Sequence, residues 1–455
     1  MSTLNLTLLT DLYEMTMMQG YYEEKQNETV IFDVFFRQNP CGNGYSVCAG
    51  LEQVIDYVKN LNFTYEDVDY LRSLHIFSED FLHYLSGFHF SGDIYAIPEG
   101  TLIFPREPLV KVVAPIMEAQ LIETAVLNII NHQSLIATKA ARVCYAAQGD
   151  GVMEFGLRRA QGPDSGTYGA RAAVIGGCKG TSNVLAGQMF DVPVLGTHAH
   201  SWIMSFPDEY TAFKKYAELY PSACILLVDT YDTLKSGMPN AIKVFKEMRE
   251  AGIPLTYYGI RMDSGDLAYL SKKVRKMLDD AGFPDAVISA SNDLDEYLIE
   301  SLKIQDAKIN SWGVGTRLIT SNDNPAFGGV YKLAAVKDPT TGEFVPKIKL
   351  SENTAKVTNP GNKTVYRIYS KSTGKIKADL ICLADEKINP DETMVVFLSG
   401  SQSGTRPDHW TRKWWHHQIR LQTASYKLPW KDKQGHRCQY GFHSLLIQSL
   451  LPAFL

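Results

Sequence analysis

The sequence predicts an α/β protein, in which an irregular α/β barrel with parallel strands stands beside a smaller β-rich α/β sandwich domain built from N-terminal and C-terminal segments. From about residue 150 to residue 316, short apolar runs repeatedly end in polar or Gly-rich turns followed by helical stretches, the pattern of a parallel α/β fold. Residues 93–113 and the chain after residue 330 instead contain short β-prone runs separated by Pro and Gly. Residues 115–140, rich in Ala, Leu and Ile, predict one long buried helix.

These patterns divide the chain into four segments. Residues 1–125 are expected to form the N-terminal part of the sandwich domain, residues 126–328 the barrel, and residues 329–398 the return to the sandwich. Residues 399–455 form an atypical tail, because they hold four of the six Trp and five of the 11 His, with eight Lys or Arg and only two Asp or Glu. This shift to a basic composition indicates a divergent ending, an alternative exon or a change of reading frame.

The overall composition limits the kinds of partner. The chain has 455 residues, of which 45% are hydrophobic and 21% charged, as in ordinary globular proteins. A net charge of -5 gives no reason to expect nucleic acid or an anionic membrane as a partner. The N-terminus lacks a secretory signal, no apolar run could span a bilayer, and the seven Cys are scattered without a CxxC. We therefore expect a cytoplasmic protein with reduced thiols.

The polar loops after the predicted strands are the natural place for chemistry. Right-handed crossovers bring the carboxyl ends of parallel strands to one side, which in a barrel carries the active site. The loops are EFGLRR (154–159), KGTSN (179–183), GTHAHS (196–201), VDTYDT (228–233), GIRMDSGD (259–266), SASND (289–293) and SWGVGT (311–316). The last two have the small residues that let backbone N–H groups cradle a phosphate. GxxxxGK[ST] and GxGxxG are absent, which argues against a kinase or a Rossmann domain.

His198 and His200 allow three interpretations: a metal pair, a phosphoryl-accepting or acid/base histidine, or ordinary turn residues. Residues two apart on a strand point the same way, so both rings could face one pocket. A zinc site would need further ligands, and no His occurs between residues 201 and 408, so these would be almost all carboxylates. The phosphoryl-accepting interpretation needs supporting groups nearby.

GIRMDSGDL supplies such groups. Its two carboxylates suit sugar hydroxyls or Mg²⁺, and Arg261 suits an anion. Asp266 is expected close to the capping position of the helix that follows, which leaves Asp263 as the functional residue. Asp229 and Asp232 in VDTYDT are either Mg²⁺ or sugar ligands or turn residues.

Taken in order, these loops closely resemble those of nicotinate phosphoribosyltransferases. The matching stretches cover roughly residues 5–395 and are LTDLYEMTM, YAIPEGTLIFPREPL, EFGLRRAQGPDSG, GTSNVLAG, GTHAHSW, LLVDTYDT, IRMDSGDL, GVGTRL and KVTNPGNKTVYR. The resemblance implies a homodimer that condenses nicotinate with phosphoribosyl pyrophosphate, giving nicotinate mononucleotide and pyrophosphate in NAD salvage from nicotinate. It also implies Mg²⁺ and coupling to ATP hydrolysis through a phosphohistidine.

The resemblance assigns roles residue by residue. His200 is the phosphohistidine and His198 a bystander, while Arg261 and Asp263 hold the ribose and pyrophosphate. Related nicotinamide-specific enzymes carry Asp at the position of Ser182, where an acid would repel the carboxylate of nicotinate. The resemblance also implies that Tyr13 reaches the neighbouring subunit's site and sandwiches the pyridine ring together with Phe155. Asp229 is implied as a Mg²⁺ ligand. The other substrate-binding residues implied are Arg158, Ser182 and Thr197 for the base, Gly313, Gly315 and Thr316 for the 5′-phosphate, and Asp266, Asn292 and Asp293.

Two alternatives remain open at this point. A zinc barrel hydrolase would bind metal and would not depend on phosphoribosyl pyrophosphate. A non-catalytic paralogue or inactive isoform would bind ligands or subunits without turnover; the intact loops argue against it and the abnormal tail argues for it.

Overall fold

The computed structural model describes residues 5–353 and 356–388 and, as backbone only, the strands β16 (Met394–Leu398), β17 (Thr411–Trp415), β18 (Ile419–Thr423) and β19 (Tyr426–Lys427). Most of the predicted atypical tail therefore lies outside the described residues. The chain forms two compact units: unit 1 is Met1–Asn131 with Phe327–Leu455, and unit 2 is His132–Ala326. The predicted α/β class is confirmed: in place of the expected irregular barrel the chain has a curled parallel sheet that forms a half-barrel, and the expected β-rich domain has separate antiparallel sheets.

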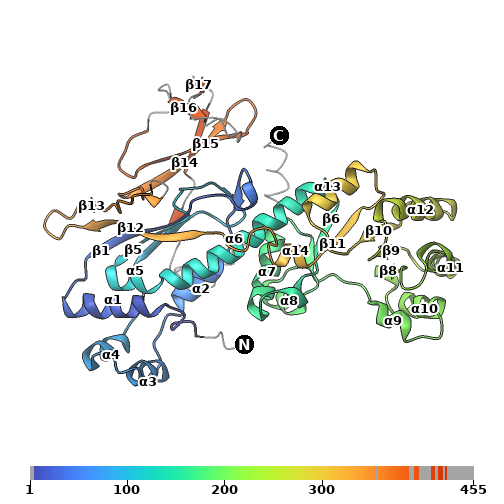
Figure 1. Ribbon diagram of the computed structural model, residues 1–455, viewed down its shortest axis with the longest axis horizontal. Helices are drawn as coiled ribbons and strands as arrows, with labels where there is room; N and C mark the ends of the chain where they lie inside the picture. The colour runs from blue at the N-terminus through green and yellow to red at the C-terminus, as the bar shows by residue number, and fades with distance from the viewer. Residues whose placement is uncertain are drawn as a thin grey trace. The chain divides into compact units, whose positions relative to one another are not determined.

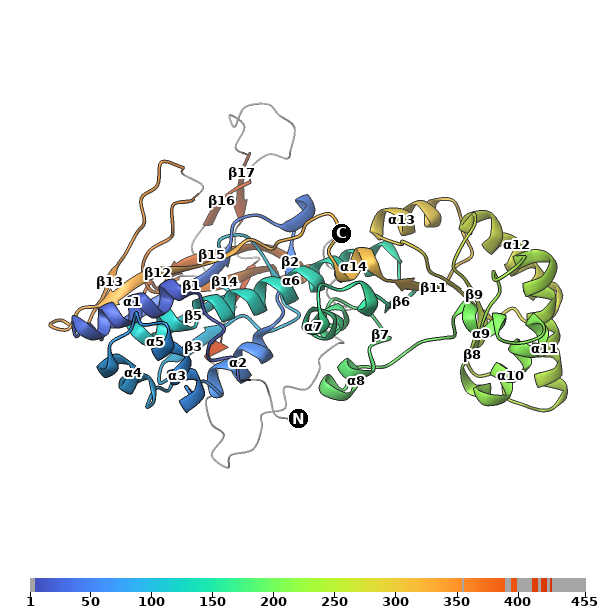
Figure 2. The same ribbon diagram turned by 60° about the horizontal axis from the view of Figure 1, so that its bottom comes forward.

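Unit 2 is built on a curled parallel sheet (Figures 1 and 2) with the strand order β7-β6-β11-β10-β9-β8. Its strands are short and mostly buried, as expected for a sheet with helical crossovers. Their bounds are β6 (Gly151–Glu154), β7 (Gly180–Thr181), β8 (Cys224–Leu227), β9 (Tyr258–Met262), β10 (Val287–Ala290) and β11 (Ser311–Val314). Every neighbouring pair is parallel, so all six carboxyl ends lie at one edge.

The helices of unit 2 begin where the strand-end loops finish. They are α7 (Pro163–Ile175), α8 (Val184–Phe190), α9 (His200–Met204), α10 (Glu209–Leu219), α11 (Met238–Glu250), α12 (Leu267–Asp280), α13 (Glu296–Ile304) and α14 (Thr316–Ile319). Several of these starts are fixed by side-chain caps that accept a backbone N–H of the first turn, from Asn183, Asp208, Asp266 and Asp295. The loops after β7, β9 and β10 are therefore held at both ends, by a strand and by a capped helix.

Unit 1 centres on a six-stranded sheet with the order β13-β12-β1-β5-β3-β19, in which the N-terminal strand β1 (Thr29–Phe36) pairs antiparallel with β12 (Gly329–Lys337). N-terminal and C-terminal segments therefore share one sheet. The other strands of unit 1 are β2 (Ser46–Val47), β3 (Asp93–Ala96), β4 (Leu102–Ile103), β5 (Val110–Pro115), β13 (Phe344–Pro346), β14 (Lys363–Ser370) and β15 (Ile376–Leu383).

The helices of unit 1 are α1 (Leu12–Glu23), α2 (Leu51–Lys59), α3 (Tyr65–Ser73), α4 (Glu79–Leu85) and α5 (Ile116–Leu121), and α6 (Glu123–Ala146) runs on into unit 2. The single helix predicted over 115–140 is thus two helices, interrupted at Ile122. Within the described residues, no helix combines the length and apolar character needed to cross a membrane.

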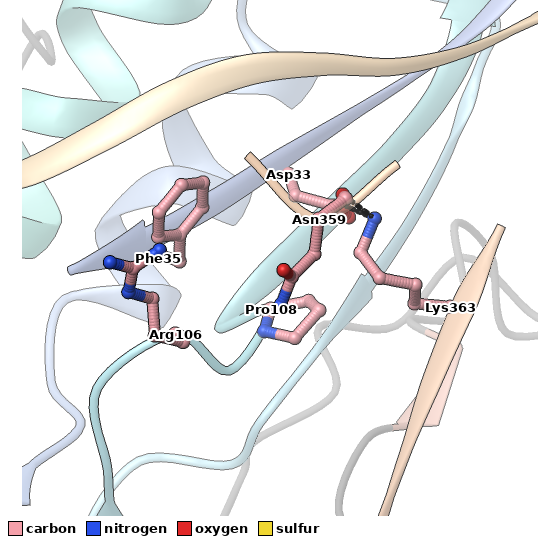
Figure 3. Close-up of a pocket in the computed structure, with 6 residues that line it drawn as sticks. All are labelled: Asp33, Phe35, Arg106, Pro108, Asn359 and Lys363. Carbon is pink, nitrogen blue, oxygen red and sulfur yellow. Dashed lines mark hydrogen bonds and ion pairs between the residues drawn. The ribbon is translucent and has the colours of Figure 1, made fainter. Parts of the chain in front are cut away.

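A buried ion pair holds the turn before β14 in unit 1 (Figure 3). Lys363 Nζ lies 2.7 Å from Asp33 Oδ2 and donates to the carbonyls of Asn359, at 2.6 Å, and Gly361, at 3.0 Å. Burial raises the pKa of Asp33, and the charges of Lys363 and Lys111 oppose that rise. The pocket beside the pair encloses ≈ 10 Å³, space for about one water molecule, so it is too small for a substrate.

Candidate active site

His200 is the first residue of α9 and lies beside the loops that follow β8 and β9, at one end of the parallel sheet. Its Nδ1 is 3.1 Å from the hydroxyl of Thr230, in the loop after β8. Its Nε2 lies 3.9 Å from Asp229 Oδ1 and 3.9 Å from Asp263 Oδ2. The side chain is 40% exposed, so the ring is fixed by neighbours from two other loops and is still open to a ligand.

Asp229 is a buried carboxylate that ties two of these loops together. Its Oδ2 accepts hydrogen bonds from the Asp263 N–H, at 2.7 Å, and from the Ser264 hydroxyl, at 2.6 Å. Its Oδ1 has no hydrogen-bond partner in the structure, although the side chain is only 3% exposed. A buried carboxylate oxygen without a donor is costly, which makes this atom a natural contact for a cation or a ligand donor.

Arg261 and Asp263 form the next part of the site. Arg261 donates from Nη2 to Asp263 Oδ1 at 3.1 Å, from Nη1 to the Thr197 hydroxyl at 2.9 Å, and from Nε to the Ser291 hydroxyl at 2.8 Å. Ser291 in turn donates to Asp263 Oδ1. Burial pushes the pKa of Asp263 upward, but the bond from Ser291 and the charge and bond of Arg261 outweigh it and hold the pKa below its usual value. Asp263 is therefore ionised at neutral pH.

His198 has a different environment from His200. It is buried, its Nε2 accepts the Leu227 N–H at 3.3 Å, and its ring centroid lies 4.5 Å from that of Tyr216. Burial lowers its pKa to about 4, so the ring is neutral at pH 7. The expectation that both rings could face one pocket is therefore wrong. A helix begins at residue 200, so the strand-like spacing does not apply, and the two rings contact different residues.

The predicted base-binding residues lie on neighbouring strand ends. Phe155 follows β6, and a Cβ placed on Gly313 of β11 would stand 2.6 Å from the Phe155 ring. Gly313 is therefore required by the packing of that ring. Ser182 directly follows β7, is partly buried, and donates its N–H to the Glu154 carbonyl at 3.0 Å. Arg158 lies in a short 3₁₀ turn and is exposed.

Of the remaining predicted residues, all but Tyr13 follow strands at the carboxyl edge of the parallel sheet. Asn292 and Asp293 are exposed and have φ of 100° and 37°, a strained left-handed pair directly after β10. Asp266 caps α12 through Tyr269 N–H, the capping role that its position predicted. Gly315 and Thr316 are half-buried where β11 passes into α14. Tyr13 belongs to α1 in unit 1 and is 46% exposed.

Two residues of the site escaped the sequence prediction. Thr230 contacts His200, and Ser291 joins Arg261 to Asp263. Thr230 is the third residue after β8 and Ser291 the first after β10, and both lie inside loops that were singled out. Hydroxyl residues are common in turns, so only their position within three residues of a strand end distinguished them.

The residues present suit Mg²⁺ better than zinc. Across the described ranges, no group of three or more His, Cys, Asp or Glu is placed to hold a metal ion, whereas zinc requires three or four protein ligands. Mg²⁺ at phosphate sites needs only one or two carboxylates, with phosphates and water completing its shell. The partnerless Oδ1 of Asp229 fits that requirement.

The sequence matches three descriptions of one family. These are the nicotinate phosphoribosyltransferase N-terminal domain over residues 8–131, the nicotinate phosphoribosyltransferase family over 151–363, and the C-terminal domain over 362–406. The last match ends at residue 406, whereas the visible resemblance stops near residue 395, so the first residues of the segment expected to be atypical, 399–406, belong to the family match.

Curated relatives and solved structures agree with this assignment. The nicotinate phosphoribosyltransferase of Bacillus subtilis is 52% identical over 394 residues, which are 86% of this chain and 79% of that protein. The human enzyme is 33% identical over 439 residues, covering 84% of this chain and 80% of that protein. The crystal structure of human nicotinic acid phosphoribosyltransferase superposes with a TM-score of 0.78 at 29% identity, covering 97% and 93% of the two chains. Nicotinate-nucleotide pyrophosphorylase from Pyrococcus furiosus, at 21% identity and a TM-score of 0.70 over 99% and 96% of the chains, shares the fold. The chain therefore belongs to the nicotinate phosphoribosyltransferase family.

Proposed function

We propose that this chain transfers the phosphoribosyl group of phosphoribosyl pyrophosphate to nicotinate, and that ATP hydrolysis is coupled to turnover through phosphorylation of His200. Family membership supports the transfer reaction. The observation that carries the role of His200 is its position: a ring open to ligands, with carboxylates on the Nε2 side and a hydroxyl on the Nδ1 side. In a cell, this reaction would be the first step of NAD salvage from nicotinate, the Preiss-Handler route.

The neighbours of His200 favour one tautomer for the phosphorylation step. Negative charge from Asp229 and Asp263 favours the proton on Nε2, which leaves the lone pair on Nδ1, where the Thr230 hydroxyl holds the ring. As ATP binds, the Thr230 hydroxyl releases Nδ1, whose lone pair attacks the γ-phosphorus, and the bond to the bridging oxygen breaks with its electrons going to ADP. Water later displaces the histidine and releases phosphate.

The transfer step needs positioning and charge stabilisation more than acid–base chemistry. The pyridine nitrogen of nicotinate forms a bond to the anomeric carbon as the bond from that carbon to pyrophosphate breaks, and the electrons leave with pyrophosphate. Asp263, ionised and fixed by Arg261 and Ser291, is suited to the ribose hydroxyls and to the positive charge that develops on the sugar. Arg261 is suited to the pyrophosphate.

Asp229 is the residue proposed to hold Mg²⁺, through its partnerless Oδ1. When bound, the ion would neutralise phosphate charge on both ATP and phosphoribosyl pyrophosphate. Phe155 and Arg158 are proposed to hold the base with Ser182 and Thr197, and Gly315, Thr316, Asn292 and Asp293 to surround the 5′-phosphate. We also propose a cytoplasmic homodimer in which Tyr13 completes the neighbouring subunit's site.

The test is the formation of nicotinate mononucleotide from nicotinate, phosphoribosyl pyrophosphate and Mg²⁺, followed by chromatography. We expect product with nicotinate, far less with nicotinamide, and none without phosphoribosyl pyrophosphate or with a chelator of Mg²⁺. A cooperatively melting dimer that makes no product would instead establish the non-catalytic alternative. The zinc hydrolase alternative has lost its basis, since His198 faces Tyr216 and Leu227.

A further inference from the structure

Glu154 is a buried carboxylate that the proposed reaction does not use. It is 0% exposed, at the last position of β6. Within the described ranges no Lys or Arg forms an ion pair with it, and burial raises its pKa against the opposing bonds from Thr181 and Gly156. An unpaired acid in a protein interior is costly, so a fold that retains one needs it for its hydrogen bonds.

Those hydrogen bonds join two strand-end loops. Oε1 accepts the N–H of Gly156, in the loop after β6, and Oε2 accepts the hydroxyl of Thr181, at 2.6 Å, at the end of β7. Thr181 is itself 0% exposed and accepts the Asn183 N–H at 3.0 Å. The carboxylate therefore reaches the backbone of the second loop through one buried hydroxyl.

The residues beside these contacts are the ones proposed to bind the base. Phe155 stands between Glu154 and Gly156, and Ser182 stands between Thr181 and Asn183. Thr181 also exchanges backbone hydrogen bonds with Pro193 and Leu195, at 3.0 and 2.8 Å, shortly before Thr197. A shift of Thr181 would thus move Ser182 directly and the approach to Thr197 as well.

The backbone beside Glu154 has little space in which to move if the contacts of Glu154 change. A Cβ on Gly156 would lie 2.5 Å from Ile319 Cβ and 2.8 Å from Glu154 Oε1. The backbone that carries Phe155 is thus fixed on one side by packing and on the other by the carboxylate.

We infer that Glu154, acting through Thr181, is a positioning residue that sets the distance between Phe155 and Ser182 and so determines how well nicotinate binds. The inference rests on the proposed function, because it assumes that these two residues face the base. Glu154 touches neither substrate; it acts through the two loops.

Thr181→Val tests this most cleanly, because it keeps the shape of the side chain and removes only the hydroxyl. We expect the KM for nicotinate to rise about 10-fold or more, since small displacements of positioning groups have effects on the order of 10²-fold. The KM for phosphoribosyl pyrophosphate should change less than about 2-fold, because Asp263 is held by Arg261 and Ser291, and only the bond from Arg261 to Thr197 links this network to the segment that Thr181 holds. Thr181→Ser should restore the wild-type KM.

The matched control is Thr138→Val, which removes another buried hydroxyl of unit 2, bonded to the Ser134 carbonyl at 2.6 Å in α6. It should leave both KM values unchanged. Unchanged nicotinate kinetics in Thr181→Val, or an equal rise in both KM values, would overturn the inference. Calorimetric titration with nicotinate measures the affinity of each variant for the base without turnover. If the wild type binds nicotinate but makes no product, only the proposed function is rejected. A loss of nicotinate affinity of about 10-fold in Thr181→Val would then still support the inference.

Discussion

Gly313→Ala tests whether the ring of Phe155 must lie where the structure places it. The new Cβ would stand 2.6 Å from Phe155 Cδ2 and 2.7 Å from Cε2, and 3.4 Å from the Ser291 Cβ. Carbon atoms in contact prefer about 3.5–4.0 Å, so the ring must move by roughly 1 Å. Overpacking of this kind costs about 1–3 kcal/mol of folding stability.

The expected effect on activity follows from the same displacement. A Phe155 ring displaced by about 1 Å would stack less well on the pyridine ring of nicotinate. We therefore expect kcat/KM for nicotinate to fall on the order of 10- to 100-fold. Steady-state kinetics and thermal melting would be measured together. Gly44→Ala is the control, because its new Cβ would have nothing within 4 Å and its φ is not in the left-handed region.

A double-mutant cycle identifies the clash itself. In a Phe155→Leu background the ring is absent, so adding Gly313→Ala should cost much less stability than it does in the wild type. The reasoning is refuted if Gly313→Ala melts and turns over like the wild type, or if its cost is the same with and without the Phe155 ring.

Three further predictions concern other parts of the site. Ser182→Asp places an acid where the carboxylate of nicotinate is proposed to lie, so use of nicotinate should fall; unchanged kinetics with nicotinate would refute the assignment. Ser291→Ala removes the hydroxyl between Arg261 and Asp263, so the KM for phosphoribosyl pyrophosphate should rise about 10-fold with little change for nicotinate, and the reverse pattern would contradict the network. The third concerns His198, whose pKa is lowered to about 4 in the folded chain, against about 6.5 when unfolded. The free energy of unfolding therefore has its full value above pH 6.5 and decreases as the pH falls toward 4, because the unfolded chain binds a proton that the folded chain does not. The loss is about 2 kcal/mol at pH 5. Chemical denaturation at pH 7.5 and pH 5 should show a smaller loss in His198→Gln than in the wild type, and equal losses would show that this ring is not responsible.

Much of the architecture could be predicted because the sequence pattern of parallel strands is distinctive. Each of the short buried strands of unit 2 ends in a polar loop, and the shared direction of the strands alone places loops such as VDTYDT and GIRMDSGD together. The pairing of β1 with β12 agrees with the expected domain of N-terminal and C-terminal segments, although the run Thr29–Phe36 was not singled out as a strand.

What escaped prediction depends on contacts between residues distant in sequence. The break at Ile122 and the start of α9 at His200 are local changes of backbone that apolar periodicity does not report. Gly313 was predicted to cradle a phosphate, and that role stays a prediction; the structure adds a different reason for glycine, the ring of Phe155 on a distant strand end. Glu154 and Thr181 had no signal, because a buried acid at a strand end looks like any other polar loop residue.

The central claim is that His200 accepts a phosphoryl group and thereby couples ATP to phosphoribosyl transfer. The most direct measurement is the rate of nicotinate mononucleotide formation with and without ATP, in the wild type and in His200→Ala, with acid-labile phosphate on the chain followed by radiolabelled ATP. We expect ATP to stimulate the wild type and to label it, and His200→Ala to be neither stimulated nor labelled while still making product slowly. Equal ATP stimulation in both proteins, or label that persists without His200, would contradict it.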